Sequence, residues 1–98
     1  MADYGIYKVK YDSDHSEIVE VHAYKIENNS TNGSNTFTRD GVISKIEANL
    51  KVVTLMKKSD GNWEIGAEVI VYKVDDEKFI KTEANNTKKD NLGKLPEY

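Results

Sequence analysis

Alternating apolar and polar residues mark the first part of the chain as a pair of strands. The strands are predicted at residues 4–11 and 18–26, with a polar turn between them. Strict alternation puts Tyr7 and Val9 on one face of the first strand and Ile6 on the other. The two strands are expected to pair as an antiparallel hairpin. The second strand places its aliphatic side chains on one face and its polar and aromatic ones on the other: Val19, Val21 and Ala23 against Glu20, His22 and Tyr24.

A polar stretch and a short helix follow. Residues 28–36 contain no apolar side chain, and such a composition offers too little burial to offset the entropy of ordering, so a mobile surface loop is predicted. Thr38 is a suitable N-cap for a helix from 39 to about 48. Within that helix, Val42, Ile43 and Ile46 have the spacing of one buried face.

Three further strands are predicted at residues 50–57, 63–74 and 78–82. Gly61 can adopt the positive φ that the tight turn before the second of them needs. The element order is therefore β-β-α-β-β-β. This order predicts a single α+β domain over residues 1–98, with a mainly antiparallel five-stranded sheet and one short helix.

The C-terminal tail, residues 83–98, is expected to pack on this sheet in an extended form. One short helix covers only part of a five-stranded face, and Leu92, Leu95 and Tyr98 are suited to anchor the tail there. Pro96 disfavours helix at the residue before it. Asp90 and Asn91 can hydrogen-bond nearby backbone amides and hold the tail in place.

The tail also carries the most specific motif of the chain. Thr82 is followed by Asn85 or Asn86 with Thr87, then by Asp90, Asn91, Leu92, Leu95, Pro96 and Tyr98. This pattern resembles the end of a family of small bacterial and phage domains, domain of unknown function 3892. The resemblance is specific over about the last seventeen residues. It implies a compact fold and a phage or prophage origin, and it implies no activity, substrate or catalytic residue.

Composition narrows the function classes. The chain has no cysteine and a formal net charge of -3, so a thiolate site is excluded and no basic stripe for nucleic acid is present. Its first residues carry neither a basic stretch nor an apolar run. We therefore expect no signal peptide, no membrane span and a cytoplasmic location, in a bacterial or infected host cell.

No catalytic set is evident in the sequence, and no cofactor is implied. His15 follows Asp12 and Asp14, a pattern that a metal could use, but a short acidic turn is more typically solvated, so no metal is expected. Arg39, the single arginine, stands at the predicted helix N-terminus, where an anion could bind. A surface ion pair with Asp40 or a nearby glutamate is the simpler interpretation.

The expected function is that of a non-catalytic binding module. It would engage a host protein or a small anionic ligand and assemble as a homo-oligomer through a strand edge. The alternative is recognition of nucleotides or single-stranded nucleic acid through exposed aromatic side chains and Arg39. An enzyme is not expected. The candidate contact residues are Arg39, Trp63, Tyr72 and Asn91.

Overall fold

The structure, a computed structural model, describes residues 2–15, 17–27, 30–82, 90–92 and 95–98. Residues 28–29 of the predicted loop and Asn85, Asn86 and Thr87 of the tail motif lie outside these ranges. The elements, in chain order, are β1 Tyr4–Tyr11, β2 Ile18–Glu27, β3 Ser30–Thr38, α1 Arg39–Glu47, β4 Val52–Lys57, β5 Trp63–Glu68, β6 Ile70–Val74 and β7 Glu77–Lys81.

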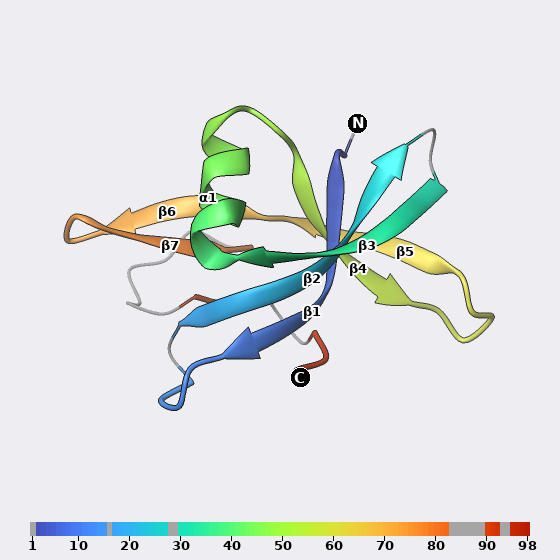
Figure 1. The fold of residues 1–98 in the computed structure, drawn as a ribbon, viewed down its shortest axis with the longest axis horizontal. Helices are drawn as coiled ribbons and strands as arrows, with labels where there is room; N and C mark the ends of the chain where they lie inside the picture. The colour runs from blue at the N-terminus through green and yellow to red at the C-terminus, as the bar shows by residue number, and fades with distance from the viewer. Residues whose placement is uncertain (1, 16, 28–29, 83–89, 93–94) are drawn as a thin grey trace.

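A five-stranded sheet organises the fold, with the strand order β3-β2-β1-β4-β5. All of its pairs are antiparallel except β1 with β4, which run parallel. Strands β6 and β7 form a separate antiparallel hairpin, which extends away from the sheet on the side of α1 (Figure 1). The predicted α+β class, with a mostly antiparallel five-stranded sheet and one short helix, is confirmed.

The prediction of a loop at 28–36 is wrong for residues 30–36, because they belong to β3. This strand is polar, but it pairs with β2 along its whole length, so the ladder of backbone hydrogen bonds supplies what burial does not. Gly33, at φ 50°, takes up the irregularity where the register shifts beside Tyr24. At the end of the strand, Phe37 packs edge-on against Tyr4, with ring centroids 5.3 Å apart.

The single strand predicted at 63–74 is also wrong, because Val69 interrupts it. Strand β5 pairs with β4, whereas β6 pairs with β7 in the second sheet. Between them Val69 is buried in the core, and its N–H donates to the carbonyl of Val52. At this one buried residue the chain stops pairing with β4 and begins to pair with β7. Consequently, the fifth strand of the main sheet is β3, and the strand predicted at 78–82 is β7 of the hairpin.

Two irregularities in the pairing of β1 with β2 change which side chains face the core. The register shifts between Ile6 and Lys8 and again between Lys10 and Tyr11. As a result Ile6 and Val9 are both buried, although strict alternation places them on opposite faces. Val19, expected in the core, is 41% exposed, while Ile18 beside it is fully buried. A bulge adds one residue to one strand and so re-aims the side chains after it.

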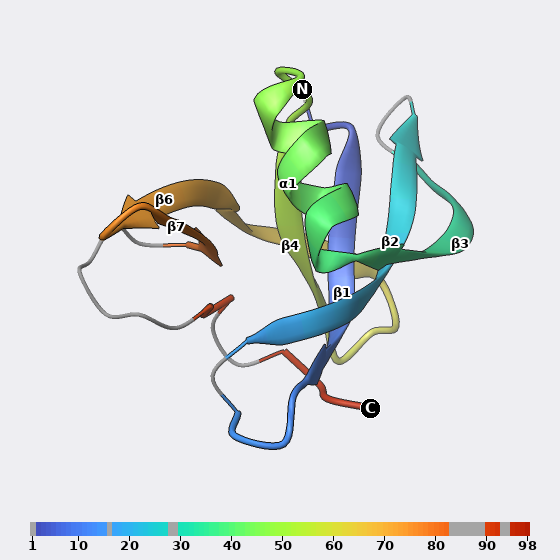
Figure 2. The same ribbon diagram turned by 60° about the vertical axis from the view of Figure 1, so that its left-hand side comes forward.

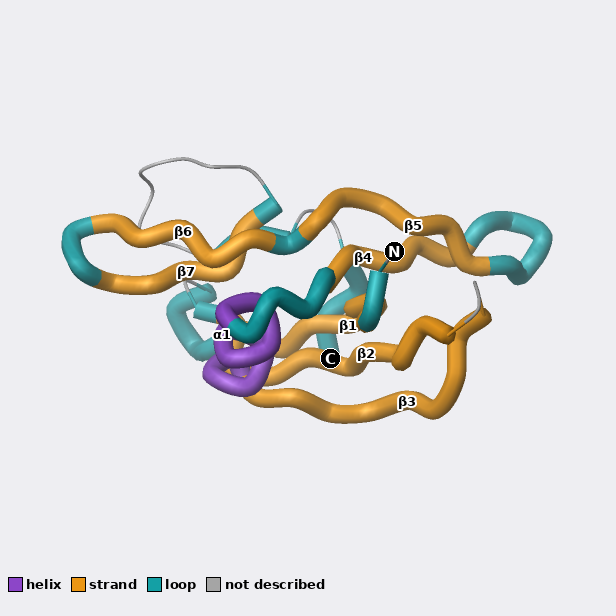
Figure 3. The backbone as a smooth tube through the Cα atoms, turned by 90° about the horizontal axis from the view of Figure 1, so that it is seen from above, coloured by secondary structure: helices purple, strands orange, loops and turns teal. Residues whose placement is uncertain are grey.

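Helix α1 covers one face of the sheet and lies beside the β6–β7 hairpin (Figures 2 and 3). The Thr38 hydroxyl accepts a hydrogen bond from the Gly41 N–H at 3.2 Å, so Thr38 is the N-cap, as predicted. The helix buries Val42 and Ile43. The core cluster draws on the sheet, the helix, the hairpin and the tail: Ile6, Val9, Ile18, Val21, Ala23, Val42, Ile43, Val52, Val69, Ile80, Leu92 and Leu95.

The described parts of the tail link the hairpin to the main sheet. Near its start the Asn91 N–H donates to the Ile80 carbonyl of β7. Near its end the Val9 N–H donates to the Pro96 carbonyl at 2.9 Å, and the Tyr98 N–H donates to the Val9 carbonyl at 3.0 Å. The tail therefore pairs with β1 beyond the point where β4 leaves it. No helix in the described part of the chain is long and apolar enough to cross a membrane.

Candidate functional site

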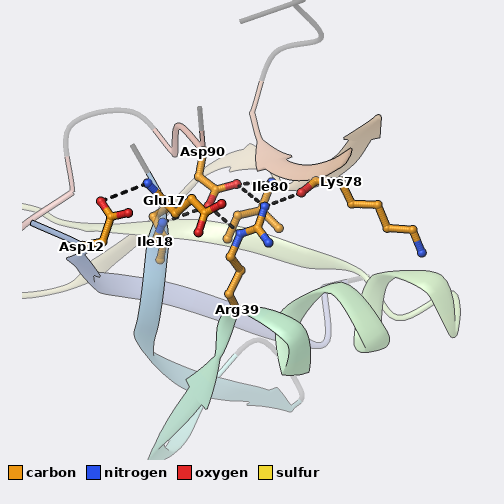
Figure 4. Close-up of polar contacts among 7 residues, drawn as sticks. All are labelled: Asp12, Glu17, Ile18, Arg39, Lys78, Ile80 and Asp90. Carbon is orange, nitrogen blue, oxygen red and sulfur yellow. Dashed lines mark hydrogen bonds and ion pairs between the residues drawn. The ribbon is translucent and has the colours of Figure 1, made fainter. Parts of the chain in front are cut away.

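A buried carboxylate, Asp90, forms the first candidate site (Figure 4). One of its oxygens accepts from the Ile18 N–H at 2.8 Å and from Arg39 Nε at 2.7 Å. The other accepts from the Ile80 N–H at 2.8 Å and from Arg39 Nη2 at 3.2 Å. The Asp90 side chain is 0% exposed, whereas that of Arg39 is 20% exposed. We call this group the Asp90 hub.

The hub changes the interpretation of Arg39. Its guanidinium binds Asp90 and also donates to the carbonyl of Lys78. Burial alone lowers the pKa of Arg39, but the hydrogen bond to Asp90 and the charge of Asp90 outweigh it and raise the pKa above its usual value. The partner is therefore a tail aspartate rather than Asp40 or a glutamate. These contacts connect β2, α1, β7 and the tail. The role of Arg39 in them is structural.

A second cluster lies among the side chains that alternate with the core residues. It consists of Tyr7, His22, Tyr24, Trp63 and Tyr98, and we call it the aromatic face. The Tyr7 ring stacks on Tyr24 with centroids 4.5 Å apart, and Trp63 lies 5.5 Å from Tyr7 and 5.6 Å from Tyr24. His22 stacks on Tyr98 at 4.0 Å. Five rings from β1, β2, β5 and the tail thus form one continuous surface.

Local structure explains how these rings meet. The bulge in β1 falls at Tyr7, which places this ring beside His22 and Tyr24, the alternate residues of β2. Trp63 opens β5 directly after a turn in which Gly61 has φ 89°. Tyr98 reaches the cluster because the tail pairs with β1 at Val9.

Polar contacts hold two of the rings in place. The Tyr98 hydroxyl donates to Glu20 Oε1 at 3.0 Å. Burial, together with this bond and the charge of Glu20, raises the pKa of Tyr98 to about 12. His22 Nδ1 lies 3.1 Å from the Thr36 hydroxyl on β3, which is hydrogen-bond distance. These contacts connect the Tyr98 ring to β2 and the His22 ring to β3.

Beside the aromatic face lies a hollow of about 460 Å³. Its walls are apolar and aromatic: Tyr7, Leu55, Met56, Trp63, Leu95 and Pro96. Of the residues that the structure describes, the charged ones that line it are Lys8 and Lys57, and none is a carboxylate. We call it the first hollow.

A second hollow, of about 490 Å³, shares Leu55 and Trp63 with the first. Its other lining residues are small, polar or aliphatic: Ile26, Thr31, Gly61, Asn62 and Ile65. Leu55 is 2% exposed, whereas Met56 and Ile65 at the two hollows are 51% and 55% exposed. The two hollows therefore adjoin at Trp63 and are bordered by exposed apolar side chains.

The residues predicted as contacts do not form one site. Trp63 lies between the two hollows, and Leu95, Pro96 and Tyr98 of the tail border the same surface. Arg39 belongs to the Asp90 hub, and Asn91, the tail residue after Asp90, forms a bridge with Lys81 of β7. Tyr72 lies on β6, with the Lys81 ammonium 5.8 Å from its ring centroid. Trp63 is thus the one predicted contact residue that the aromatic face includes.

Sequence reasoning missed several residues of this surface. His22 and Tyr24 were available as alternate residues on one strand face. Tyr7 was hidden by the bulge, and Leu55 and Met56 could be assigned only once β4 and β5 were paired. The pattern of one strand does not show which residues of other strands adjoin it.

His15 is placed by the tail rather than by a metal set. Its Nε2 lies 3.0 Å from Glu97 Oε1, and its ring stacks on Tyr11 with centroids 3.8 Å apart. Among the residues that the structure describes, no group of three or more histidine, cysteine, aspartate or glutamate side chains is arranged to hold a metal ion.

Comparison with known proteins identifies the family but no characterised relative. No curated protein and no solved structure matches the chain. The model of one protein family, described as "Protein of unknown function (DUF3892)", matches residues 5–96. This match spans nearly the whole chain: it includes all but the first residue of β1, every later strand, and α1. The chain therefore belongs to the DUF3892 family.

Proposed function

We propose that this protein is a non-catalytic binding module and that the aromatic face with its two hollows is the surface that binds another protein. The first hollow supports this most directly, because it combines aromatic, methionine and proline walls with exposed apolar side chains at its border. Tyrosine, tryptophan and methionine are enriched in protein interfaces, and tryptophan and tyrosine supply many of their strongest contacts.

The state of the rings favours a protein over a nucleic acid. A base needs an accessible ring face to stack on, but Tyr7 stacks on Tyr24 and His22 stacks on Tyr98. One face of each of these four rings is therefore occupied by another ring. Arg39, the cation assigned to the nucleotide alternative, is bound to Asp90 in the hub. A protein side chain needs a hollow and a rigid rim, both of which this surface offers.

A comparison of two exposed apolar residues tests the proposal. Met56 and Leu50 are 51% and 37% exposed, but only Met56 lines the first hollow. We would immobilise the wild type, Met56→Glu and Leu50→Glu, pass a lysate of the source cell over each, and identify retained proteins by mass spectrometry.

The proposal predicts a protein that the wild type and Leu50→Glu retain and that Met56→Glu loses. That protein, once purified, must bind the wild type in a reconstituted complex and fail to bind Met56→Glu. If both variants retain the same proteins in the same amounts, the aromatic face is not the binding surface. Circular dichroism of the two variants checks that each remains folded.

A further inference from the structure

We propose that the partner presents an extended segment, with a large apolar side chain in the first hollow, a smaller side chain in the second, and carboxylates beside the apolar one. This inference rests on the proposed function and adds the chemistry of the partner. It is carried by the arrangement of the hollows around Trp63 and by the charge of their lining.

The adjoining hollows indicate an extended chain. They share Leu55 as a common floor and Trp63 as a common wall. In an extended segment alternate side chains point the same way and lie roughly 7 Å apart, whereas the residue between them points away. Such a segment can therefore place two side chains on opposite sides of Trp63.

The lining residues indicate which side chain each hollow takes. The first hollow has aromatic, methionine, leucine and proline walls, which suit phenylalanine, leucine or methionine. The second is lined partly by Thr31, Gly61 and Asn62, which can meet a threonine, serine or asparagine. The partner segment thus has an apolar residue followed or preceded, two positions away, by a small polar one.

The charge of the first hollow indicates acidic neighbours. Among the residues that the structure describes, Lys8 and Lys57 line it without any carboxylate, and neither lysine forms an ion pair. Glu20 is hydrogen-bonded to Tyr98, and Glu97 is paired with His15. A carboxylate on the partner would meet two lysine ammonium groups, and complementary charges give specificity and faster association.

Synthetic peptides test this directly. The probes are short, capped, tryptophan-free peptides with a central phenylalanine and a threonine two positions on, flanked by aspartates in one version and by lysines in another. A third version replaces the phenylalanine of the acidic peptide by glycine. Trp63 is the one tryptophan in the chain, so its fluorescence reports occupation of either hollow.

The acidic phenylalanine peptide is expected to bind the wild type about fivefold more tightly than the basic one, as two exposed ion pairs would give. The Lys8→Glu/Lys57→Glu variant should reverse this order, whereas Lys73→Glu/Lys78→Glu, at exposed lysines of the hairpin, should keep it. The glycine version should not bind. Equal binding of the acidic and basic peptides would overturn the assignment of charge.

Other outcomes separate this inference from the proposed function. If no peptide changes the Trp63 signal but the lysate partner is still lost by Met56→Glu, the extended-segment mode is wrong and the binding surface stands. If a single-stranded oligonucleotide changes the signal and the peptides do not, the choice of a protein partner is wrong. If the lysate comparison also shows no effect of Met56→Glu, both the surface and the inference fail.

Discussion

Single residues fix how the tail is held and how the aromatic face is shaped. Asp90 accepts four hydrogen bonds from three separate parts of the chain, and Gly5 leaves room for Leu55 under the two hollows. Position 90 requires a carboxylate, and position 5 requires the absence of a side chain. Substitutions at them therefore test the account most sharply at this scale.

Asp90→Asn should destabilise the protein by about 3–5 kcal/mol, the usual cost of removing one partner of a buried ion pair. The asparagine amide would point N–H groups at the backbone N–H and guanidinium donors that the Asp90 carboxylate oxygens now accept from. Chemical denaturation measures the change. Asp14→Asn, in the exposed turn between β1 and β2, is the matched control and should change stability by less than about 0.5 kcal/mol. A similar small change for Asp90→Asn would show that the hub is not a structural centre.

Gly5→Ala should weaken binding at the aromatic face by displacing the floor of its hollows. An added Cβ would lie 2.4 Å from Leu55 Cδ1, so Leu55 must move, at a cost of about 1–3 kcal/mol in stability. Gly33→Ala offers a contrast, because a Cβ there meets nothing within 4 Å and only the positive φ opposes it. We expect the purified partner to distinguish the two variants. Unchanged affinity for Gly5→Ala would argue against the hollows as the contact surface.

Tyr98 should make the protein sensitive to alkali. The folded state raises the pKa of Tyr98 to about 12, whereas tyrosine in the unfolded chain titrates near ~10. Between these values the unfolded chain has lost the proton that the folded one keeps, so stability is unaffected below about pH 10 and falls as the pH rises to 12. Tyr98→Phe should make this fall shallower in denaturation curves. An identical slope for wild type and variant would contradict the account of Tyr98.

At the scale of elements, the tail is part of the core rather than an appendage. Leu92 and Leu95 are 2% and 8% exposed and belong to the same cluster as the helix residues Val42 and Ile43. Backbone hydrogen bonds join the tail to β7 at one end and to β1 at the other. The tail therefore connects the hairpin to the main sheet, in addition to the β5–β6 crossing and the contacts of α1 with the hairpin.

Truncation after Thr87 should lower the melting temperature strongly, because it removes Asp90 and both leucines together. Leu92→Ala alone should cost about 2–5 kcal/mol, as for other buried leucines. Thermal unfolding followed by circular dichroism gives both values. A truncated chain that melts at the wild-type temperature would show that the tail does not hold the sheets together.

The elements that sequence predicted best are those whose local pattern agrees with their surroundings. Thr38 and the Val42–Ile43 pair define α1 by local chemistry, and the tail leucines could be assigned from an uncovered sheet face. Strand β3 could not be predicted from its own composition, because its order comes from pairing with β2. The same holds for Val69, whose burial depends on β4 and the core, and for Tyr7, which only the bulge brings to the aromatic face.

On the scale of the whole molecule, the outer strands of the described main sheet are candidates for self-association. β3 and β5 are the outer strands of the main sheet, and β5 carries Ile65, which is 55% exposed. An exposed apolar edge is prone to pair with another chain, so we propose that the expected homo-oligomer forms through β5. Light scattering should give a dimer or larger mass for the wild type and a monomer for Ile65→Lys. A wild type that is strictly monomeric would refute this assembly.

The aromatic face and the Asp90 hub lie at different parts of the fold, and they have different tasks. The hub joins elements that are distant in sequence and so gives the sheet its fixed shape. That shape in turn holds five rings and two hollows without help from a ligand. Binding and stability should therefore be separable: substitutions at Met56 affect the partner, and substitutions at Asp90 affect the fold.

Site-specific photo-crosslinking tests the central claim most directly. A photoreactive phenylalanine analogue would replace Met56 in one protein and Leu50 in another, and each would be irradiated in a lysate of the source cell. The account predicts a covalent adduct with one identified protein from position 56 and none with that protein from position 50. The same adducts from both positions, or no adduct from position 56, would contradict the claim that the aromatic face is the binding surface.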